Sequence, residues 1–173
     1  MYYGISKDPN TKDFMLIMDY YELGDLGRCI AKKFYDLDWN NKLDILNYII
    51  KGLDHIHGQN VIHRDLHSGN ILYGNASNKH PVVISDLGIS KSSTELMDNN
   101  EIYGIISYMA PEIFNRQKYT TASDIYSFGM IMWELMTGRI PFWDRNHDTE
   151  LIFEICDGLR PPIVTNAPKG ILN

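Results

Sequence analysis

The chain has 173 residues, of which 44% are hydrophobic and 22% are charged, a composition typical of one globular domain with a sizeable core. Its net charge of −6 supplies no overall attraction for nucleic acid or for an anionic membrane, so neither is expected as a partner. Two scattered cysteines, Cys29 and Cys156, exclude a disulfide framework and favour a reducing, cytoplasmic setting, and no apolar run reaches the length of a membrane span.

The N-terminal residues have the pattern of an antiparallel hairpin. Two apolar segments, residues 2–6 and 14–20, are rich in aromatic and branched side chains. They flank a turn that contains the sequence Asp8-Pro9-Asn10. We therefore predict two short, paired strands at this end of the chain.

A long helix is predicted over residues 39–57. Asp38 precedes the segment and can cap its start, and Gly58 follows where a left-handed residue commonly ends a helix. Apolar residues recur at three-to-four spacing and so form one face of this helix: Leu43, Leu46, Ile49, Ile50, Leu53 and Ile56.

Short strands and a polar loop follow this helix. Residues 71–73 and 82–85 are apolar and are predicted as strands joined by a polar turn. Residues 87–109 are rich in Ser, Thr, Asn and Asp, and we predict a loop there because the segment is too polar to lie in a core.

Two further helices are predicted near the C-terminus. Residues 123–137 are apolar on nearly all sides, which is typical of a buried helix, and Gly138 would end it. A second helix is expected over residues 148–157, with Asp148 as its cap and Gly158 at its end. The residues from 160 onward are expected to be irregular.

Three motifs carry polar and charged side chains in a characteristic order. They are His63-Arg64-Asp65-Leu66-His67-Ser68-Gly69-Asn70, Asp86-Leu87-Gly88, and Ala110-Pro111-Glu112. With the blocks at 52–57 and 123–129, they resemble the eukaryotic protein kinase catalytic domain, and the style most resembles the tyrosine-kinase-like group.

The resemblance implies an α+β, protein-kinase-like fold. Residues 1–22 would be a two-strand remnant of the N-terminal lobe together with the hinge, and residues 23–173 an incomplete, mostly helical C-terminal lobe. The chain contains no counterpart of the family's Gly-rich loop, of its third-strand lysine, or of its arginine-bearing C-terminal helices. We therefore expect a catalytic domain that is truncated at both ends.

The same resemblance implies that ATP and Mg²⁺ are the cofactors. Asp65 would accept or orient the proton of the attacking hydroxyl. Asn70, a catalytic candidate, and Asp86 would both be metal ligands, because their hard oxygen donors suit magnesium. His67 stands where Ser/Thr kinases usually carry a lysine near the transferred phosphate, and it is the third catalytic candidate.

Four residues are candidates for nucleotide binding. Asp19 and Tyr21 fall in the expected hinge, whose backbone groups would hydrogen-bond adenine, and Leu72 would form the floor under the base. Asp25 matches a position where the family often places a ribose-binding acid. An acid that stabilises a helix N-terminus is an equally weighted alternative for Asp25.

Residues 87–109 resemble an activation segment, and Arg64 is the candidate receptor for a phosphate on it. The candidate phosphorylation sites are Ser90, Ser92, Ser93, Thr94 and Tyr103. A solvated polar loop is the alternative for each of these five residues taken singly.

Three residues are candidates for structural roles. Asp124 would hold the backbone of the catalytic loop, and His63 belongs to that loop. Glu112 would pair with an arginine of the family's C-terminal helices.

Histidines also invite a different interpretation. Four histidines fall close together in the sequence: His55, His57, His63 and His67. A zinc site is an unfavoured alternative, because no cysteine lies among them to complete a common structural zinc site.

The expected function is transfer of the γ-phosphate of ATP to a protein hydroxyl, with serine or threonine favoured. The choice between Ser/Thr and Tyr stays open, because Ile105 replaces the threonine typical of Ser/Thr kinases. The isolated chain is not expected to be competent, since positioning of the nucleotide is most of the catalysis. A non-catalytic, kinase-like binding or regulatory module is the alternative, and the oligomeric state is unknown.

Overall fold

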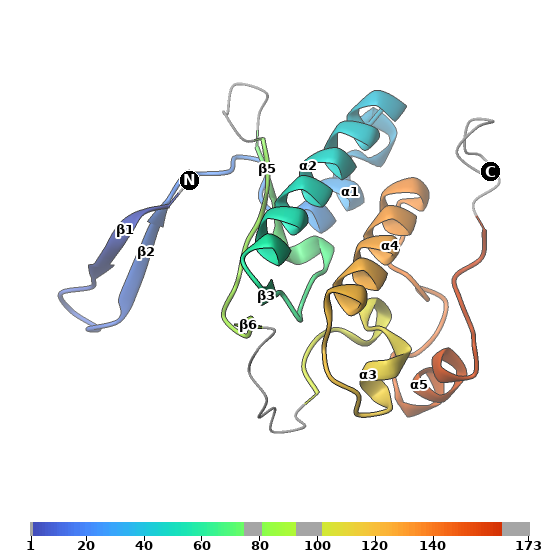
Figure 1. The fold of residues 1–173 in the computed structure, drawn as a ribbon. Helices are drawn as coiled ribbons and strands as arrows, with labels where there is room; N and C mark the ends of the chain where they lie inside the picture. The colour runs from blue at the N-terminus through green and yellow to red at the C-terminus, as the bar shows by residue number, and fades with distance from the viewer. Residues whose placement is uncertain (1, 75–80, 93–101, 164–173) are drawn as a thin grey trace.

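A computed structural model describes residues 2–74, 81–92 and 102–163. Within them the chain is α+β, with helices dominating and strands paired only in twos (Figure 1). The expected fold class is confirmed. Figure 1 shows the β1–β2 hairpin standing to one side of the helices, while the long helices α2 and α4 lie next to each other.

The N-terminal hairpin forms as predicted. β1 (Tyr2–Lys7) pairs antiparallel with β2 (Phe14–Met18). Asp8 shapes the turn, because its Oδ1 accepts hydrogen bonds from the backbone N–H groups of Asn10 at 2.7 Å and Thr11 at 3.0 Å. The strands pair with each other, and most of their side chains are exposed.

Helix α2 (Trp39–Gly58) confirms the long predicted helix and its cap, since Asp38 Oδ1 accepts from the Asn41 N–H at 2.7 Å. The predicted terminator is wrong. Gly58 stays helical, and Asn60 takes the left-handed conformation with a φ of 57°. An asparagine tolerates that conformation better than most residues, so the helix includes the glycine and the left-handed residue comes two positions later.

The apolar face of α2 differs from the predicted one at its start. Leu43 is 45% exposed, whereas Ile45 is 2% exposed and lies in the core. Ile49 and Leu53 are buried as the spacing indicates.

Short elements surround these two helices. Helix α1 (Leu26–Lys33) leads into the 3₁₀ turn η1 (Phe34–Asp36). β4 (Ile71–Tyr73) pairs antiparallel with β5 (Val82–Ile84), which confirms both predicted strands. The 3₁₀ turn η2 (Ser68–Asn70) leads directly into β4.

The segment predicted as a loop over 87–109 contains two regular elements. β6 (Lys91–Ser92) pairs with β3 (Val61–Ile62), and η3 (Ile106–Tyr108) is a 3₁₀ turn. The two-residue strand β6 forms because β3, which is distant in sequence, pairs with it. Such a short strand has no periodic pattern that could be recognised in the sequence.

The C-terminal helices are α3 (Pro111–Phe114), α4 (Thr121–Thr137) and α5 (Thr149–Cys156). Helix α4 begins earlier than predicted, because Thr120 and Ser123 form a capping box, and Gly138 ends it with a φ of 73°. Asp148 caps α5 as expected. Helix α4 is central but not buried all round, since Ile125 is 46% exposed.

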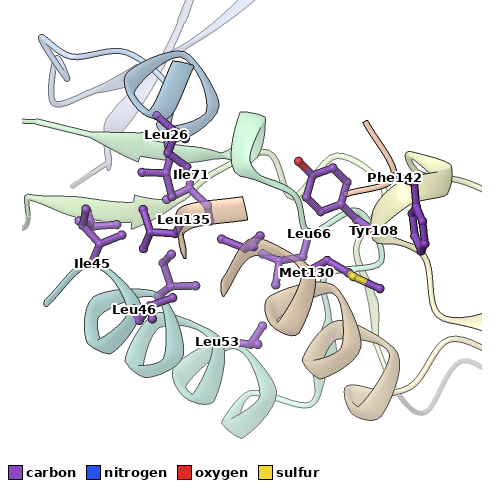
Figure 2. Packing of buried hydrophobic residues seen from close by; sticks show 14 of the residues in the cluster. Leu26, Ile45, Leu46, Leu53, Leu66, Ile71, Tyr108, Met130, Leu135 and Phe142 are labelled. Atoms are coloured by element: carbon purple, nitrogen blue, oxygen red, sulfur yellow. The ribbon is translucent and has the colours of Figure 1, made fainter. Parts of the chain in front are cut away.

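The main core lies between α2, α4 and the β4–β5 pair. Figure 2 shows side chains from α2 facing side chains from α4 and β4. The members that it labels come from segments far apart in the sequence: Leu26, Ile45, Leu46, Leu53, Leu66, Ile71, Tyr108, Met130, Leu135 and Phe142. Burial of this cluster fixes the loop of residues 63–70, the expected catalytic loop, against the two long helices, because Leu66 of this loop lies in the cluster. Among the described residues, no helix is both long and apolar enough to cross a membrane.

Candidate active site

Asp124, at the start of α4, holds the backbone of the loop that contains Asp65. Its Oδ2 accepts from the His63 N–H at 2.8 Å, and its Oδ1 accepts from the Arg64 N–H at 3.0 Å. His57, in the last turn of α2, places Nε2 2.8 Å from Asp124 Oδ2. One buried carboxylate therefore ties the loop to the ends of both long helices.

His63 joins this loop to the end of β5. Its Nδ1 accepts from the Asp65 N–H at 3.3 Å, and its Nε2 lies 3.1 Å from the carbonyl oxygen of Ser85, which can only accept. The ring is completely buried. Ser90 adds a further link, since its hydroxyl donates to the His63 carbonyl at 3.2 Å. Asp65 and the segment that carries Asp86 are thus held by one imidazole.

Asp65 is a partly exposed carboxylate with a histidine beside it. His67 Nε2 lies 3.8 Å from Asp65 Oδ2. The imidazole of His67 is the largest influence that keeps the pKa of Asp65 below its ordinary value; burial opposes that shift. A carboxylate with a lowered pKa is ionised at neutral pH and can accept a hydrogen bond from an approaching hydroxyl.

Asn70 contacts Asp65, and Asp86 lies on a segment that is bonded to the backbone of Asn70. The Asn70 side-chain amide donates to the Asp65 carbonyl at 2.9 Å, which leaves its Oδ1 for another ligand. Ser85, the neighbour of Asp86, donates its backbone N–H to the Asn70 carbonyl at 2.8 Å. This bond joins the backbone of Asn70 to the segment that carries Asp86. Asp86 is exposed, and its Oδ1 accepts from the Gly88 N–H at 3.1 Å. This donor set fits Mg²⁺, which takes few protein oxygens and keeps other positions for phosphate and water.

A zinc site among the four histidines finds no support. Among the described residues, no group of three or more His, Cys, Asp or Glu side chains is placed to hold a metal ion. His57 and His63 are instead engaged with Asp124 and with the backbone.

The segment with the nucleotide-binding candidates runs beside β4. Tyr73 pairs with Leu23 and Gly24 through backbone hydrogen bonds, and Leu72 forms a bridge with Asp25. The Tyr21 carbonyl accepts from the Gly24 N–H at 3.0 Å, and Asp19 Oδ1 accepts from the Tyr3 hydroxyl at 2.5 Å.

Asp25 caps helix α1 in this structure. Its Oδ1 accepts from the Arg28 N–H at 2.8 Å, and its Oδ2 lies 3.1 Å from Arg28 Nε. Both carboxylate oxygens are thereby engaged, which favours the helix-terminus interpretation of this residue over the ribose one.

Arg64 is buried beside two tyrosines. Its guanidinium lies 4.5 Å from the ring centroid of Tyr119 and 5.5 Å from that of Tyr103. Of the phosphorylation candidates, Ser90 bonds the catalytic loop, Ser92 lies in β6, and Tyr103 is exposed. Ser93 and Thr94 lie outside the described residues.

Glu112 lies in the first turn of α3 and is partly exposed. Its side chain has no ion-pair partner among the residues that the structure describes. The guanidinium of Arg160 lies 5.3 Å from the ring centroid of Tyr126 and donates to the carbonyls of Ile155 and Leu159.

A buried polar cluster, which sequence reasoning missed, lies behind the catalytic loop. Glu134 of α4 accepts from the Tyr108 hydroxyl at 2.7 Å and from the Ser68 hydroxyl at 3.0 Å. Burial raises the pKa of Glu134 and also that of Tyr108. An acid inside an otherwise apolar helix was the one sequence signal that could have identified this cluster.

The cluster lines one side of a recess of about 330 Å³, which the loop residues Ser68 and Gly69 also line. His67, Ser107 and Glu134 contribute polar groups to its wall, and Ile30 and Ile105 contribute apolar ones. Asp65 itself does not line the recess, but the ring of His67, which does, lies 3.8 Å from the Asp65 carboxylate.

Comparison with known proteins gives one consistent result. A family model described as protein tyrosine and serine/threonine kinase matches residues 1–173. The chain is 31% identical over 163 residues to mitogen-activated protein kinase kinase kinase 13-A of Xenopus laevis. The aligned region covers 91% of this chain and 16% of that protein. It is 34% identical over 164 residues to the probable serine/threonine-protein kinase roco5 of Dictyostelium discoideum. The aligned region covers 90% of this chain and 6% of that protein.

A viral protein gives a similar match. The chain is 32% identical over 168 residues to a putative serine/threonine-protein kinase/receptor of Acanthamoeba polyphaga mimivirus, which covers 94% of this chain and 10% of that protein. The chain therefore spans less than a fifth of the length of each of these three relatives.

Proposed function

Because this chain belongs to the protein tyrosine and serine/threonine kinase family, we propose that the protein that carries it transfers the γ-phosphate of ATP to a serine or threonine hydroxyl of a protein substrate. The observation that supports this most directly is that hydrogen bonds join Asp65, Asn70 and the segment of Asp86. Asp65 bonds to His63, Asn70 bonds to Asp65, and Ser85 beside Asp86 bonds to Asn70. The names of the relatives, which are serine/threonine-protein kinases, support the choice of hydroxyl.

Asp65 orients the hydroxyl that attacks the phosphate. Its lowered pKa keeps it ionised, so it accepts the hydrogen bond of that hydroxyl and aims the oxygen. Phosphoryl transfer depends mainly on positioning, and the buried contacts of His63 and Asp124 supply a fixed backbone for this carboxylate. His67 lies beside Asp65 and faces the recess that the substrate enters.

Asn70 and Asp86 would hold Mg²⁺ through their side-chain oxygens. When bound, the ion neutralises charge on the phosphate oxygens of ATP. The amide of Asn70 is oriented by its hydrogen bond to the Asp65 carbonyl. This bond holds Asn70, the proposed metal ligand, next to Asp65, the proposed base. Leu72 and the backbone around Asp19 and Tyr21 would contact adenine. We place the protein in the cytoplasm, in keeping with its two unpaired cysteines.

The test is a transfer assay with the full-length protein that contains this sequence. We expect label from γ-labelled ATP on casein or on the protein itself, and we expect Asp65→Asn and Asp86→Ala each to abolish it. Asp54→Asn, an exposed site on α2, is the matched control and should keep wild-type activity. Transfer that persists in Asp65→Asn contradicts the assigned role. A well-folded wild-type protein that transfers no phosphate would favour the non-catalytic module.

A further inference from the structure

Tyr119, two residues before α4, holds the backbone of Tyr103 at both of its polar groups. The Tyr103 N–H donates to the Tyr119 hydroxyl oxygen at 2.9 Å, and the same hydroxyl donates to the Tyr103 carbonyl at 2.6 Å. The two residues are 16 positions apart. A single hydroxyl thus ties the end of the expected activation segment to the start of the central helix.

The segment that Tyr119 holds borders the candidate base. Gly104 has a φ of 116°, and a Cβ at this position would lie 3.4 Å from Asp65 Oδ1. The next residues, Ile105 and Ser107, line a recess together with His67, whose ring lies beside the Asp65 carboxylate. The segment that Tyr119 holds therefore approaches Asp65 at Gly104 and lines the adjoining recess at Ile105 and Ser107.

Arg64 links the same tyrosine to the catalytic loop. Its guanidinium lies 4.5 Å from the Tyr119 ring centroid, within the range of a cation–π contact. Arg64 directly precedes Asp65, and its own N–H is bonded to Asp124. Tyr119 thus contacts the loop that carries Asp65 through its ring and the segment 103–107 through its hydroxyl.

We propose that Tyr119 is a positioning residue for the protein substrate, because its hydroxyl fixes residues 103–107 beside Asp65. The inference rests on the proposed function, in which a protein hydroxyl is the acceptor. The nucleotide candidate Leu72 and the metal candidate Asp86 lie on other segments, where Leu72 bridges to Asp25 and Asp86 accepts from Gly88. Loss of the hydroxyl therefore acts on the protein substrate and not on ATP.

Tyr119→Phe in the full-length protein is the sharpest variant, because it removes the hydroxyl and keeps the ring against Arg64. Tyr35→Phe removes a hydroxyl from a residue that is 98% exposed and is the matched control. We expect Tyr119→Phe to lower kcat/KM for casein about tenfold, the effect of losing two ordinary hydrogen bonds. The KM for ATP and all constants of Tyr35→Phe should match those of the wild type.

Amide hydrogen exchange supplies a readout that needs no activity. The Tyr103 amide should exchange about tenfold faster in Tyr119→Phe than in the wild type or in Tyr35→Phe. Unchanged exchange at Tyr103, wild-type kinetics on casein, or an equal loss for casein and ATP each overturns the proposal. If the wild type transfers no phosphate, the proposed function fails by itself. Exchange at residues 103–107 then decides whether Tyr119 positions this segment.

Discussion

Replacement of Asp124 should destabilise the fold more than its single position suggests. The carboxylate accepts from two backbone N–H groups and lies 2.8 Å from His57 Nε2, and the residue is 1% exposed. Asp124→Ala leaves these donors buried without their acceptor. Each unsatisfied buried donor costs about 1–3 kcal/mol, so we expect a loss of roughly 3 kcal/mol or more in the free energy of unfolding.

Asp124→Asn keeps the volume of the side chain but changes its hydrogen-bonding groups, so it tests the two contributions separately. The amide keeps one acceptor oxygen but turns an NH₂ group toward one of the backbone donors. We therefore expect a loss of about 2 kcal/mol or more, close to that of the alanine variant. If the charge were irrelevant and packing alone mattered, the asparagine variant would be almost as stable as the wild type.

Urea unfolding followed by tryptophan fluorescence measures both variants in the full-length protein, with Asp54→Asn as the exposed control. The midpoint should fall without a change in slope, which would indicate lost stability and not a changed transition. An Asp124→Asn variant within about 0.5 kcal/mol of the wild type, the usual range for a surface substitution, would refute the reasoning.

Three further predictions concern charge and backbone. His67→Lys puts a fixed charge beside Asp65, so turnover at pH 7.5 should be kept or raised; a large loss in that kinetic assay would assign His67 a specific geometric role. Burial raises the pKa of Glu134, so the folded state binds this proton more tightly than the unfolded state, and stability should fall as pH rises from the ordinary glutamate range through the raised pKa. Glu134→Gln should remove that slope in unfolding measured across pH, and an unchanged slope would contradict it. Gly138→Ala should lower stability by about 1 kcal/mol or more in calorimetry, because Gly138 has a φ of 73° and a Cβ there would lie 2.8 Å from the Phe34 ring; an unshifted melting temperature would contradict this prediction.

The regular elements could be predicted because their causes are local. Asp38 and Asp148 sit directly before helices that they cap, and the three-to-four spacing within α2 identifies its buried face at Ile49 and Leu53. The end of α2 was missed because the choice between Gly58 and Asn60 depends on the strand that follows.

The motif residues could be named from sequence, but their contacts could not. Tyr108 and Glu134 are 26 positions apart, and Ser68 and Glu134 are 66 apart, so no local pattern joins them. The same holds for Tyr119, which precedes a helix and looks like an ordinary aromatic residue. Such contacts arise from tertiary packing, and a single sequence carries little trace of them.

The backbone at two motif residues has a consequence for how this protein tolerates change. Arg64 and Asp86 have φ values of 73° and 59°, a region that costs a residue with a side chain on the order of 1 kcal/mol or more. Glycine would relieve that strain at either position. At the exposed Asp86, a selection for thermal stability alone would therefore tend to accept glycine, whereas at the buried Arg64 glycine would also lose the contacts with the rings of Tyr103 and Tyr119. Stabilised descendants of this chain should keep Asp86, our proposed metal ligand, only where activity is selected as well.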